Sequence, residues 1–240
     1  IQFTKSPEGE NVKTRMSSSL NTEQRLTLHK AMTQRAFQQS LFSHANKITV
    51  AVDGNNQNAF FSTLHDNALE NIGGLDLGDL NIGDLKIENT TLENKPYSFV
   101  SQQGDDLGQK MFFAANNEMQ SNTSQSAVIL IGSDCPFISS EYLNAAIEFL
   151  DSFPVVIGPA NDGGYVLLGM RKIIPALFKN ISWGSERVFE QTCKVLRDES
   201  VAYKELDAFD DIDRPEDLVL LSEFSEENDY FRAFFQSVEF

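Results

Sequence analysis

An apolar run in this chain stops abruptly at a carboxylate. Val128–Gly132 reads Val-Ile-Leu-Ile-Gly, which suits a buried strand, and Asp134 follows two residues later. Ligands of open α/β sheets sit beyond the carboxyl ends of the strands, where an acid can hold a metal ion. Pro136 supports the turn that ends this strand. The alternative is that Asp134 only caps the helix expected from Ser139, since Asp is common in turns.

A basic loop follows the first expected strand. The segment 5–15 combines Lys5, Lys13 and Arg15 with a proline and Gly9, so it can wrap backbone N–H groups around a phosphate and clamp it with cations. It lacks the Gly-Lys-Ser/Thr ending of a Walker loop. We predict phosphate binding by Lys5, Gly9, Lys13 and Arg15, with a merely basic surface turn as the alternative.

A second group of acids lies in the segment 209–217. Asp213 and Glu216 have the spacing of a capping box, so Asp213 has a structural role available. Asp211 has no such role. Because clustered carboxylates repel one another unless a cation offsets them, we predict a hard divalent ion shared by Asp134 and Asp211, with Asp213 as a further ligand.

The segment 158–165 lies between two expected strands and reads Gly-Pro-Ala-Asn-Asp-Gly-Gly-Tyr. Its paired glycines let a ligand approach the backbone closely, and Asn161 and Asp162 add polar groups at the same turn. Asn-Asp-Gly-Gly is also strong turn chemistry. On these residues alone, a β-hairpin turn is the favoured interpretation.

The elements that must position these residues alternate between strand and helix patterns. Strands are expected at residues 2–4, 48–52, 97–100, 128–132, 155–157, 165–168 and 201–206, and helices at 21–42, 110–115, 139–150, 186–196 and 215–224. Asn21 and Gln24 have capping-box spacing at the start of the longest helix. This alternation predicts an α/β fold, in which helices cross between the strands of a sheet.

Residues 66–95 break the alternation. Three similar pentads begin at Leu75, Leu80 and Leu85, and a weaker one begins at Thr90. These repeats make about one coil of a solenoid, which is too little to bury a face. We expect a surface hairpin or a mobile insertion without chemistry of its own.

Composition narrows the class of partner. A formal net charge of −16 argues against nucleic acid, because such binding depends on cations that displace counterions from phosphates. No run approaches the roughly 18 apolar residues that span a bilayer, and no basic-then-apolar leader precedes the first motif, so we expect a soluble, cytoplasmic protein. Cys135 and Cys193 have no metal-binding spacing and fit reduced thiols.

Histidine and tryptophan are less informative. His29, His44 and His65 are widely separated, and we assign them no catalytic role. Trp183 is the one tryptophan of the chain. Core packing is its favoured interpretation, and a place at the border of a pocket is the alternative.

Together, the motifs resemble the DUF2064 family of GT-A-type glycosyltransferase-like proteins, relatives of the MobA-like and CofC-like nucleotidyltransferases. The matching segments are, in family order, 3–9 with 12–15, 103–108, 131–136, 158–165 and 211–218. The resemblance implies a single nucleotide-diphospho-sugar transferase-like domain over residues 1–240, with a Rossmann-like fold. Its mixed, mostly parallel sheet would carry helices on both faces, and residues 66–95 would form a surface insertion.

The same resemblance implies roles for particular residues. The N-terminal loop would face the nucleotide phosphates, and Asp134 would take the metal position. The second-substrate pocket would be lined by Asn161, Asp162, Gly163, Gly164 and Tyr165. Arg214 stands where Thr is more usual in the family, which leaves the role of the last acidic motif open.

We therefore predict a transferase that depends on Mg²⁺ or Mn²⁺ and uses an activated nucleotide. Its partners would be a nucleotide sugar or a nucleoside triphosphate, together with a small-molecule acceptor. The first interpretation is glycosyl transfer from a nucleotide-diphospho-sugar, with Asp134 at the metal and Asp162 orienting or deprotonating the acceptor. The alternatives are a nucleotidyltransferase that releases pyrophosphate and a catalytically silent nucleotide-binding module.

Overall fold

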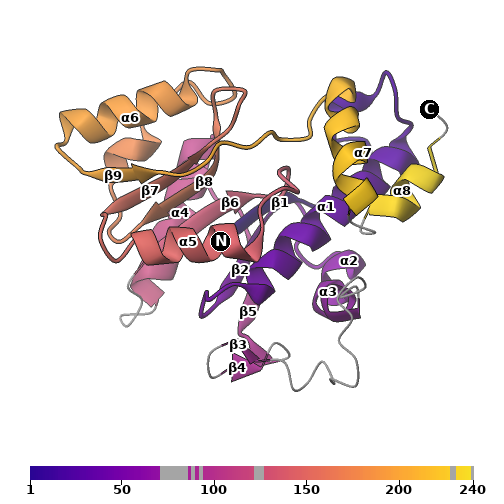
Figure 1. Cartoon of the computed structure of the whole chain (residues 1–240), viewed down its shortest axis with the longest axis horizontal. Helices are drawn as coiled ribbons and strands as arrows, with labels where there is room; N and C mark the ends of the chain where they lie inside the picture. The colour runs from indigo at the N-terminus through magenta and orange to yellow at the C-terminus, as the bar shows by residue number, and fades with distance from the viewer. Residues whose placement is uncertain (71–85, 88–89, 92–93, 122–126, 228–230, 239–240) are drawn as a thin grey trace.

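A seven-stranded sheet forms the centre of the computed structural model, which describes residues 1–70, 86–87, 90–91, 94–121, 127–227 and 231–238 (Figure 1). In spatial order its strands are β5 (Tyr97–Ser101), β2 (Ile48–Asp53), β1 (Gln2–Lys5), β6 (Val128–Gly132), β8 (Tyr165–Met170), β7 (Val155–Pro159) and β9 (Tyr203–Glu205). Strand β8 is antiparallel to both of its neighbours, and the remaining pairings are parallel. The predicted mixed, mostly parallel sheet is confirmed.

Helices connect these strands and cover both faces of the sheet. They are α1 (Thr22–Phe42), α2 (Ala59–Ser62), α3 (Leu64–Glu70), α4 (Leu107–Ser121), α5 (Ser140–Phe149), α6 (Val188–Asp198), α7 (Leu218–Glu227) and α8 (Arg232–Gln236). Short 3-10 turns lie at η1 (Thr14–Met16), η4 (Pro175–Phe178) and η5 (Pro215–Asp217). The predicted α/β fold class is therefore confirmed.

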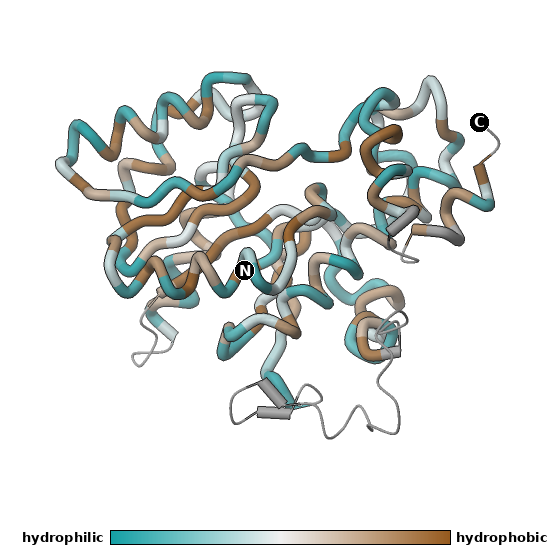
Figure 2. The backbone as a smooth tube through the Cα atoms, in the orientation of Figure 1, coloured by the Kyte–Doolittle hydropathy of each residue, from teal (hydrophilic) through white to brown (hydrophobic). Residues whose placement is uncertain are grey.

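Strand β6 illustrates why both faces are covered. Successive side chains of a strand point to opposite faces, so the apolar run buries one set on each side. Leu130 joins the cluster formed with α4 and α6, whereas Ile131 joins the cluster formed with α5. Figure 2 shows the central strands as mostly hydrophobic and the helices as mixed. Fully burying each such side chain stabilises the fold by about 1.5–3 kcal/mol.

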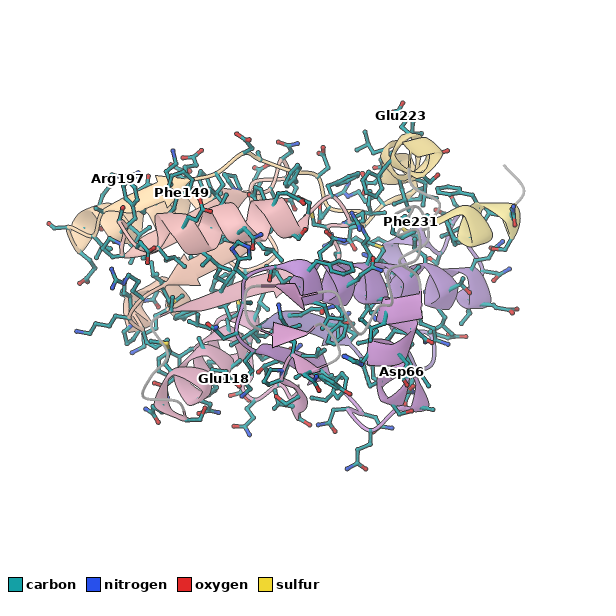
Figure 3. The ribbon with its side chains drawn as sticks, turned by 60° about the horizontal axis from the view of Figure 1, so that its bottom comes forward. Asp66, Glu118, Phe149, Arg197, Glu223 and Phe231 are labelled. Atoms are coloured by element: carbon teal, nitrogen blue, oxygen red, sulfur yellow. The ribbon has the colours of Figure 1, made fainter. Side chains whose placement is uncertain are left out.

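Helix α1 begins with the predicted capping box. The Asn21 side chain accepts a hydrogen bond from the Gln24 backbone, and the Gln24 side chain accepts one from the Asn21 backbone. The C-terminal half of α1 packs on β2 and α3, and its N-terminal half packs under α7 and α8. Phe231 is fully buried in this second cluster, while Glu223 points outward from α7 (Figure 3).

Some predicted boundaries need correction. Helix α6 begins at Val188 rather than at residue 186, because residues 181–187 form turns, and β9 covers only three residues of the expected 201–206. Helices α2 and α3 were not predicted. Within the expected insertion, Lys86–Ile87 (β3) pairs antiparallel with Thr90–Thr91 (β4), as in a hairpin. The first two pentads lie outside the described residues, and the assignment of 66–95 as an insertion in a 1–240 domain stays a prediction.

The structure also describes the two cysteines and the apolar length of the helices. Cys135 and Cys193 are both buried and free. No helix within the described ranges is long and apolar enough to cross a membrane.

The sheet order creates a crevice between β1 and β6. After β1 the chain crosses to β2 on one side, whereas β6 lies on the other side of β1 and runs parallel to it. The loops that leave the carboxyl ends of β1 and β6 therefore diverge at the same edge. Such a switch point is where open α/β sheets bind ligands.

Candidate functional site

Asp134 lies in the turn that leaves β6. The preceding Ser133 is anchored to β1, because its N–H donates to the Phe3 carbonyl at 3.0 Å and its hydroxyl accepts from Gln2 Nε2 at 2.8 Å. The Asp134 carbonyl in turn accepts from the Ile212 N–H at 2.8 Å. Ser139, rather than Asp134, caps α5. The Asp134 carboxylate is thus not used as a helix cap and faces the crevice.

Lys13 joins the basic loop to both acidic segments. Its Nζ lies 2.6 Å from Asp134 Oδ1, donates to the Ile212 carbonyl at 2.6 Å, and lies 3.7 Å from Asp213 Oδ1. The Lys13 side chain is 3% exposed, whereas that of Asp134 is 52% exposed. The Lys13 backbone is left-handed, with φ 47°, at the start of η1. The turn conformation therefore directs a buried cation towards the acids, and its predicted contact with phosphate stays a prediction.

The Asp213 carboxylate forms ion pairs and does not cap a helix. Arg15 Nη1 lies 2.7 Å from Asp213 Oδ2. The predicted capping box of Asp213 with Glu216 is wrong, because the N-cap of η5 is Arg214 and Asp217 Oδ2 accepts from the N–H groups of Asp213 and Arg214. The Asp217 carboxylate takes the structural role, which leaves the Asp213 side chain free to face the site.

The acids of the site differ in their electrostatic environments. Although desolvation opposes the charge of Asp134, the positive charge and hydrogen bond of Lys13 lower its pKa below the ordinary aspartate value. Asp211 shows the opposite effect. Burial first, and then the negative charges of Asp162, Asp213 and Asp134, raise its pKa to about 6. The charged form of Asp211 is thus opposed both by its burial and by the neighbouring carboxylates.

The segment 158–165 is a β-hairpin turn between β7 and β8, as its residues alone indicated. Gly163 has φ 89°, and a Cβ there would overlap the backbone of Glu186, so only glycine allows this close packing. Asp162 Oδ1 accepts from the Gly164 N–H at 2.8 Å, and the Asn161 N–H donates to the Phe209 carbonyl at 3.0 Å. These bonds bring the hairpin against the acidic segment 209–213.

Three connected cavities open at this edge, and Asp213 lines all of them. The first, of about 440 Å³, contains Lys5, Lys13 and Asp134; we call it the phosphate-side cavity. The second, of about 350 Å³, contains Asp162, Gly164, Tyr165 and Trp183 among apolar side chains; we call it the apolar cavity. The third, of about 840 Å³, contains Arg15, Asn161, Asp162 and Asp211; we call it the acidic cavity.

Most of the predicted site residues therefore come together at one edge, although they are far apart in sequence. Gly9 and Gly163 do not line these cavities: Gly9 shapes its loop with φ 63°, and Gly163 packs the hairpin. Trp183 borders the apolar cavity, which was the less favoured interpretation. It also packs edge-on against Tyr165.

Several residues of the phosphate-side cavity were not predicted. Asp53 ends β2 and lies 3.0 Å from Lys110 of α4, and Gln102 follows β5. The sequence feature that could have identified Asp53 and Gln102 is the one that identified Asp134, namely a polar residue at the end of an expected strand. His29 also lines this cavity, and its Nε2 lies 2.9 Å from the Lys5 carbonyl. Burial lowers the pKa of His29 below the ordinary histidine value, so it is neutral at pH 7. No sequence pattern indicated this position.

The residues fit a hard divalent cation in their chemistry. Asp134, Asp211 and Asp213 offer the carboxylate oxygens that Mg²⁺ and Mn²⁺ prefer, and a cation beside Asp211 would offset both its burial and the repulsion by its neighbours. They are not drawn together into a coordination shell, since no group of three or more His, Cys, Asp or Glu side chains is arranged to hold a metal within the described ranges. The predicted metal set stays a prediction.

The resemblance to the DUF2064 family is confirmed over residues 83–185, which match the family model described as an uncharacterized protein conserved in bacteria. This range contains Asp134 and Asp162, whereas the basic loop and the segment 209–217 lie outside it. No curated protein matches the chain.

Solved structures share the fold over nearly the whole chain. One is from Desulfovibrio desulfuricans G20, provisionally described as a nucleotide-diphospho-sugar transferase, with a TM-score of 0.77 and 24% identity over 98% of this chain and 92% of that one. Another is 4-diphosphocytidyl-2C-methyl-D-erythritol synthase from Anaerococcus prevotii DSM 20548, with a TM-score of 0.54 and 10% identity over 94% and 97% of the two chains. A third is the inositol-1-phosphate CTP transferase from T. maritima, with a TM-score of 0.50 and 12% identity over 94% and 96%.

Proposed function

We propose that this protein is a transferase that uses an activated nucleotide and moves a glycosyl group from a nucleotide-diphospho-sugar to the hydroxyl of a small acceptor. The observation that carries the proposal is the convergence of the basic loop with Asp134 and Asp213 at the switch point of the sheet. Open α/β sheets bind ligands at this edge. The three structures with the same fold are described as a nucleotide-diphospho-sugar transferase, a 4-diphosphocytidyl-2C-methyl-D-erythritol synthase and an inositol-1-phosphate CTP transferase.

The phosphates would lie in the phosphate-side cavity. Lys5, on the exposed part of the basic loop, lines this cavity and would supply a charge-assisted donor. Arg15 is 60% exposed, lines the neighbouring acidic and apolar cavities, and would supply a second donor from that side. Lys13, which is buried, would fix the position of the Asp134 carboxylate through their ion pair. A Mg²⁺ or Mn²⁺ ion held by Asp134, Asp211 and Asp213 would neutralise the developing charge on the leaving phosphate.

The acceptor would approach from the hairpin side. Asp162 is exposed at the junction of the apolar and acidic cavities, and the Gly164 N–H fixes the orientation of its carboxylate. A carboxylate in this position can accept a hydrogen bond from an acceptor hydroxyl and take its proton as the new bond forms. Asp162 is therefore the residue that we assign to orienting and deprotonating the acceptor.

Charge favours glycosyl transfer over nucleotidyl transfer to a phosphorylated acceptor. An acceptor that already carries a phosphate needs cations around that phosphate. The acidic cavity instead sets Arg15, Arg187 and Arg214 against six acids, namely Asp162, Glu186, Asp210, Asp211, Asp213 and Asp217. A neutral hydroxyl avoids the repulsion that a second phosphate would meet there.

The test is a thermal-shift panel of nucleotide sugars, nucleoside diphosphates and nucleoside triphosphates, each with and without Mn²⁺. At ~100 times its dissociation constant, a true ligand adds ~2.7 kcal/mol to the free energy of unfolding. We expect at least one nucleotide sugar to raise the unfolding temperature in a Mn²⁺-dependent way.

Product analysis separates the reactions. Release of a nucleoside diphosphate from the stabilising nucleotide sugar supports glycosyl transfer, and release of pyrophosphate from a triphosphate supports the nucleotidyl alternative. Stabilisation without any turnover across a panel of acceptors would identify a catalytically silent module. If no nucleotide stabilises the protein, the proposal fails.

A further inference from the structure

The apolar cavity differs from its two neighbours in what lines it. Apolar side chains from α4, β6, β8, the segment before α6 and the first residue of α6 line it, among them Leu107, Met111, Leu130, Tyr165, Trp183 and Val188. Its charged residues are Arg15, Asp162, Asp211 and Asp213, all of which also line the acidic cavity, so they mark the end where the two cavities adjoin. A cavity of about 350 Å³ falls within the range of small-molecule sites, which are mostly apolar with a few polar groups that orient the ligand.

The packing of its walls indicates that the cavity is preformed. A Cβ at Gly108 of α4 would overlap the Trp183 ring and the Phe178 carbonyl, so the absence of a side chain lets α4 lie directly against the Trp183 segment. A second glycine fixes the position of the segment before α6 relative to the hairpin. Gly163 packs on the backbone of Glu186, and its carbonyl accepts from the Phe189 N–H at 2.9 Å.

Apolar side chains also remain in contact with solvent there. Leu107 is 44% exposed at the mouth of the cavity, and Tyr165 and Trp183 are each partly exposed. Exposed apolar surface that is concave and continuous with polar groups is typical of a ligand site rather than of ordinary surface. A ligand that covers this wall would gain about 25 cal/mol per Å² of apolar area removed from water.

From this distribution, we infer that the acceptor is a neutral alcohol with an apolar, aromatic or aliphatic body. This inference rests on the proposed function, because it assigns the second substrate of the same site. The body would lie between Leu107 and Trp183, and the hydroxyl would face Asp162. The excess of carboxylates at the charged end disfavours an anionic acceptor, and the apolar wall gives a polyhydroxylated acceptor few partners for its hydroxyl groups.

Trp183 provides a direct probe, since the chain contains one tryptophan. The purified protein would be titrated with benzyl alcohol and with 1-hexanol, and with D-glucose as a polar comparison, while Trp183 emission is recorded. Ligands of this size bind with dissociation constants on the order of millimolar. We expect a saturable change in emission with both alcohols and none with D-glucose.

Two matched variants localise the binding. Leu107→Gln places a polar amide in the mouth of the cavity and should raise the dissociation constants of both alcohols by roughly ten-fold, because apolar contact is lost and the amide must be desolvated. Leu220→Gln makes the same change at another exposed leucine, which lies on α7 and does not line this cavity. That variant should bind the alcohols like the wild-type protein.

The outcomes separate this inference from the proposed function. A saturable change with D-glucose and not with the alcohols would overturn the inference and assign the cavity to a sugar ring. Absence of any change with the alcohols, or equal weakening by both variants, would also overturn it, while Mn²⁺-dependent stabilisation by a nucleotide sugar would leave the function standing. If no nucleotide stabilises the protein, the function fails and the acceptor assignment fails with it, even if the alcohols bind.

Discussion

Two acids lie at opposite edges of the sheet. Glu118 lies near the amino ends of β1 and β2 and is buried, and Asp211 lies beyond the carboxyl ends of the strands and is partly buried. The charges around the two carboxylates differ. Glu118 on α4 (Figure 3) receives Lys47 Nζ at 2.9 and 3.0 Å and the Thr49 hydroxyl at 2.7 Å. Asp211 lines the acidic cavity together with Asp162 and Asp213, and the negative charge of Asp134 also acts on it.

The two pKa shifts follow from this difference. Burial opposes the charge of Glu118, but the hydrogen bonds of Thr49 and Lys47 and the charge of Lys47 lower its pKa below the ordinary glutamate value. The pKa of Asp211 is raised to about 6. A cavity of about 490 Å³ also lies beside Glu118, so cavity size does not distinguish the two edges. The partners of the acid do distinguish them: Lys47 and Thr49 bind the Glu118 carboxylate at the amino edge, whereas burial and neighbouring carboxylates oppose the charge of Asp211 at the carboxyl edge.

The largest effect is expected at the carboxyl edge. Asp134→Asn keeps the shape of a half-exposed side chain but removes its charge, so Mn²⁺-dependent stabilisation by the nucleotide, ~2.7 kcal/mol at ~100 times the dissociation constant, should disappear. Turnover should fall by at least about 100-fold. Thermal shift and product release measure the two effects.

Asp198→Asn is the matched control, because Asp198 is an exposed acid paired with Lys194 on α6. It should leave both readouts unchanged. Retention of nucleotide stabilisation by Asp134→Asn would remove Asp134 from the proposed site.

A smaller effect of a different kind is expected at the amino edge. Glu118→Gln weakens the hydrogen bonds with Lys47 and Thr49 in a mostly buried position, so the free energy of unfolding in urea should fall by about 1–3 kcal/mol. Nucleotide stabilisation should persist. Glu190→Gln, at an exposed glutamate of α6, should change stability by less than about 0.5 kcal/mol. Loss of nucleotide stabilisation in Glu118→Gln would erase the distinction between the two edges.

Asp211→Asn should act in the opposite direction on stability. Neutralising this side chain removes its repulsion by Asp134, Asp162 and Asp213, so the metal-free protein should become more stable by about 1 kcal/mol. The same substitution should weaken Mn²⁺-dependent stabilisation by the nucleotide. Urea unfolding in the presence of EDTA measures the first effect. A destabilised Asp211→Asn protein would mean that Asp211 has a structural partner.

The smallest effect is a pH dependence at the amino edge. The pKa of Glu118 is lower in the folded protein than in the unfolded chain, so its ionised form stabilises the fold. That contribution is fully present above the unfolded pKa of about 4.3 and is lost as the pH falls through the folded pKa. The difference in unfolding free energy between wild type and Glu118→Gln should therefore be largest at pH 7 and shrink below about pH 4. Urea titrations at both pH values test this, and a difference that grows at low pH would contradict it.

Local patterns in the sequence predicted much of this molecule. The apolar run of β6 and the Asn21 capping box were sufficient to place a strand and a helix, because both depend on near neighbours in the chain. The acid after β6 was likewise identifiable, since the strand end itself exposes it. Boundaries were less predictable: Glu186 and Arg187 are good helix formers, but they lie in a turn, and Glu186 packs against Gly163 of the hairpin.

The sequence by itself thus determined the α/β class and the presence of four motifs that could meet at a sheet edge. Only the tertiary structure decided which charges neutralise one another there. Lys13 pairs with Asp134 across the crevice, and Asp217 rather than Asp213 binds the backbone at the start of η5. The reason is physical: hydrogen-bonding types and strand periodicity are local properties, whereas the balance of charge at a site depends on which distant segments the sheet order brings within a few ångströms of each other.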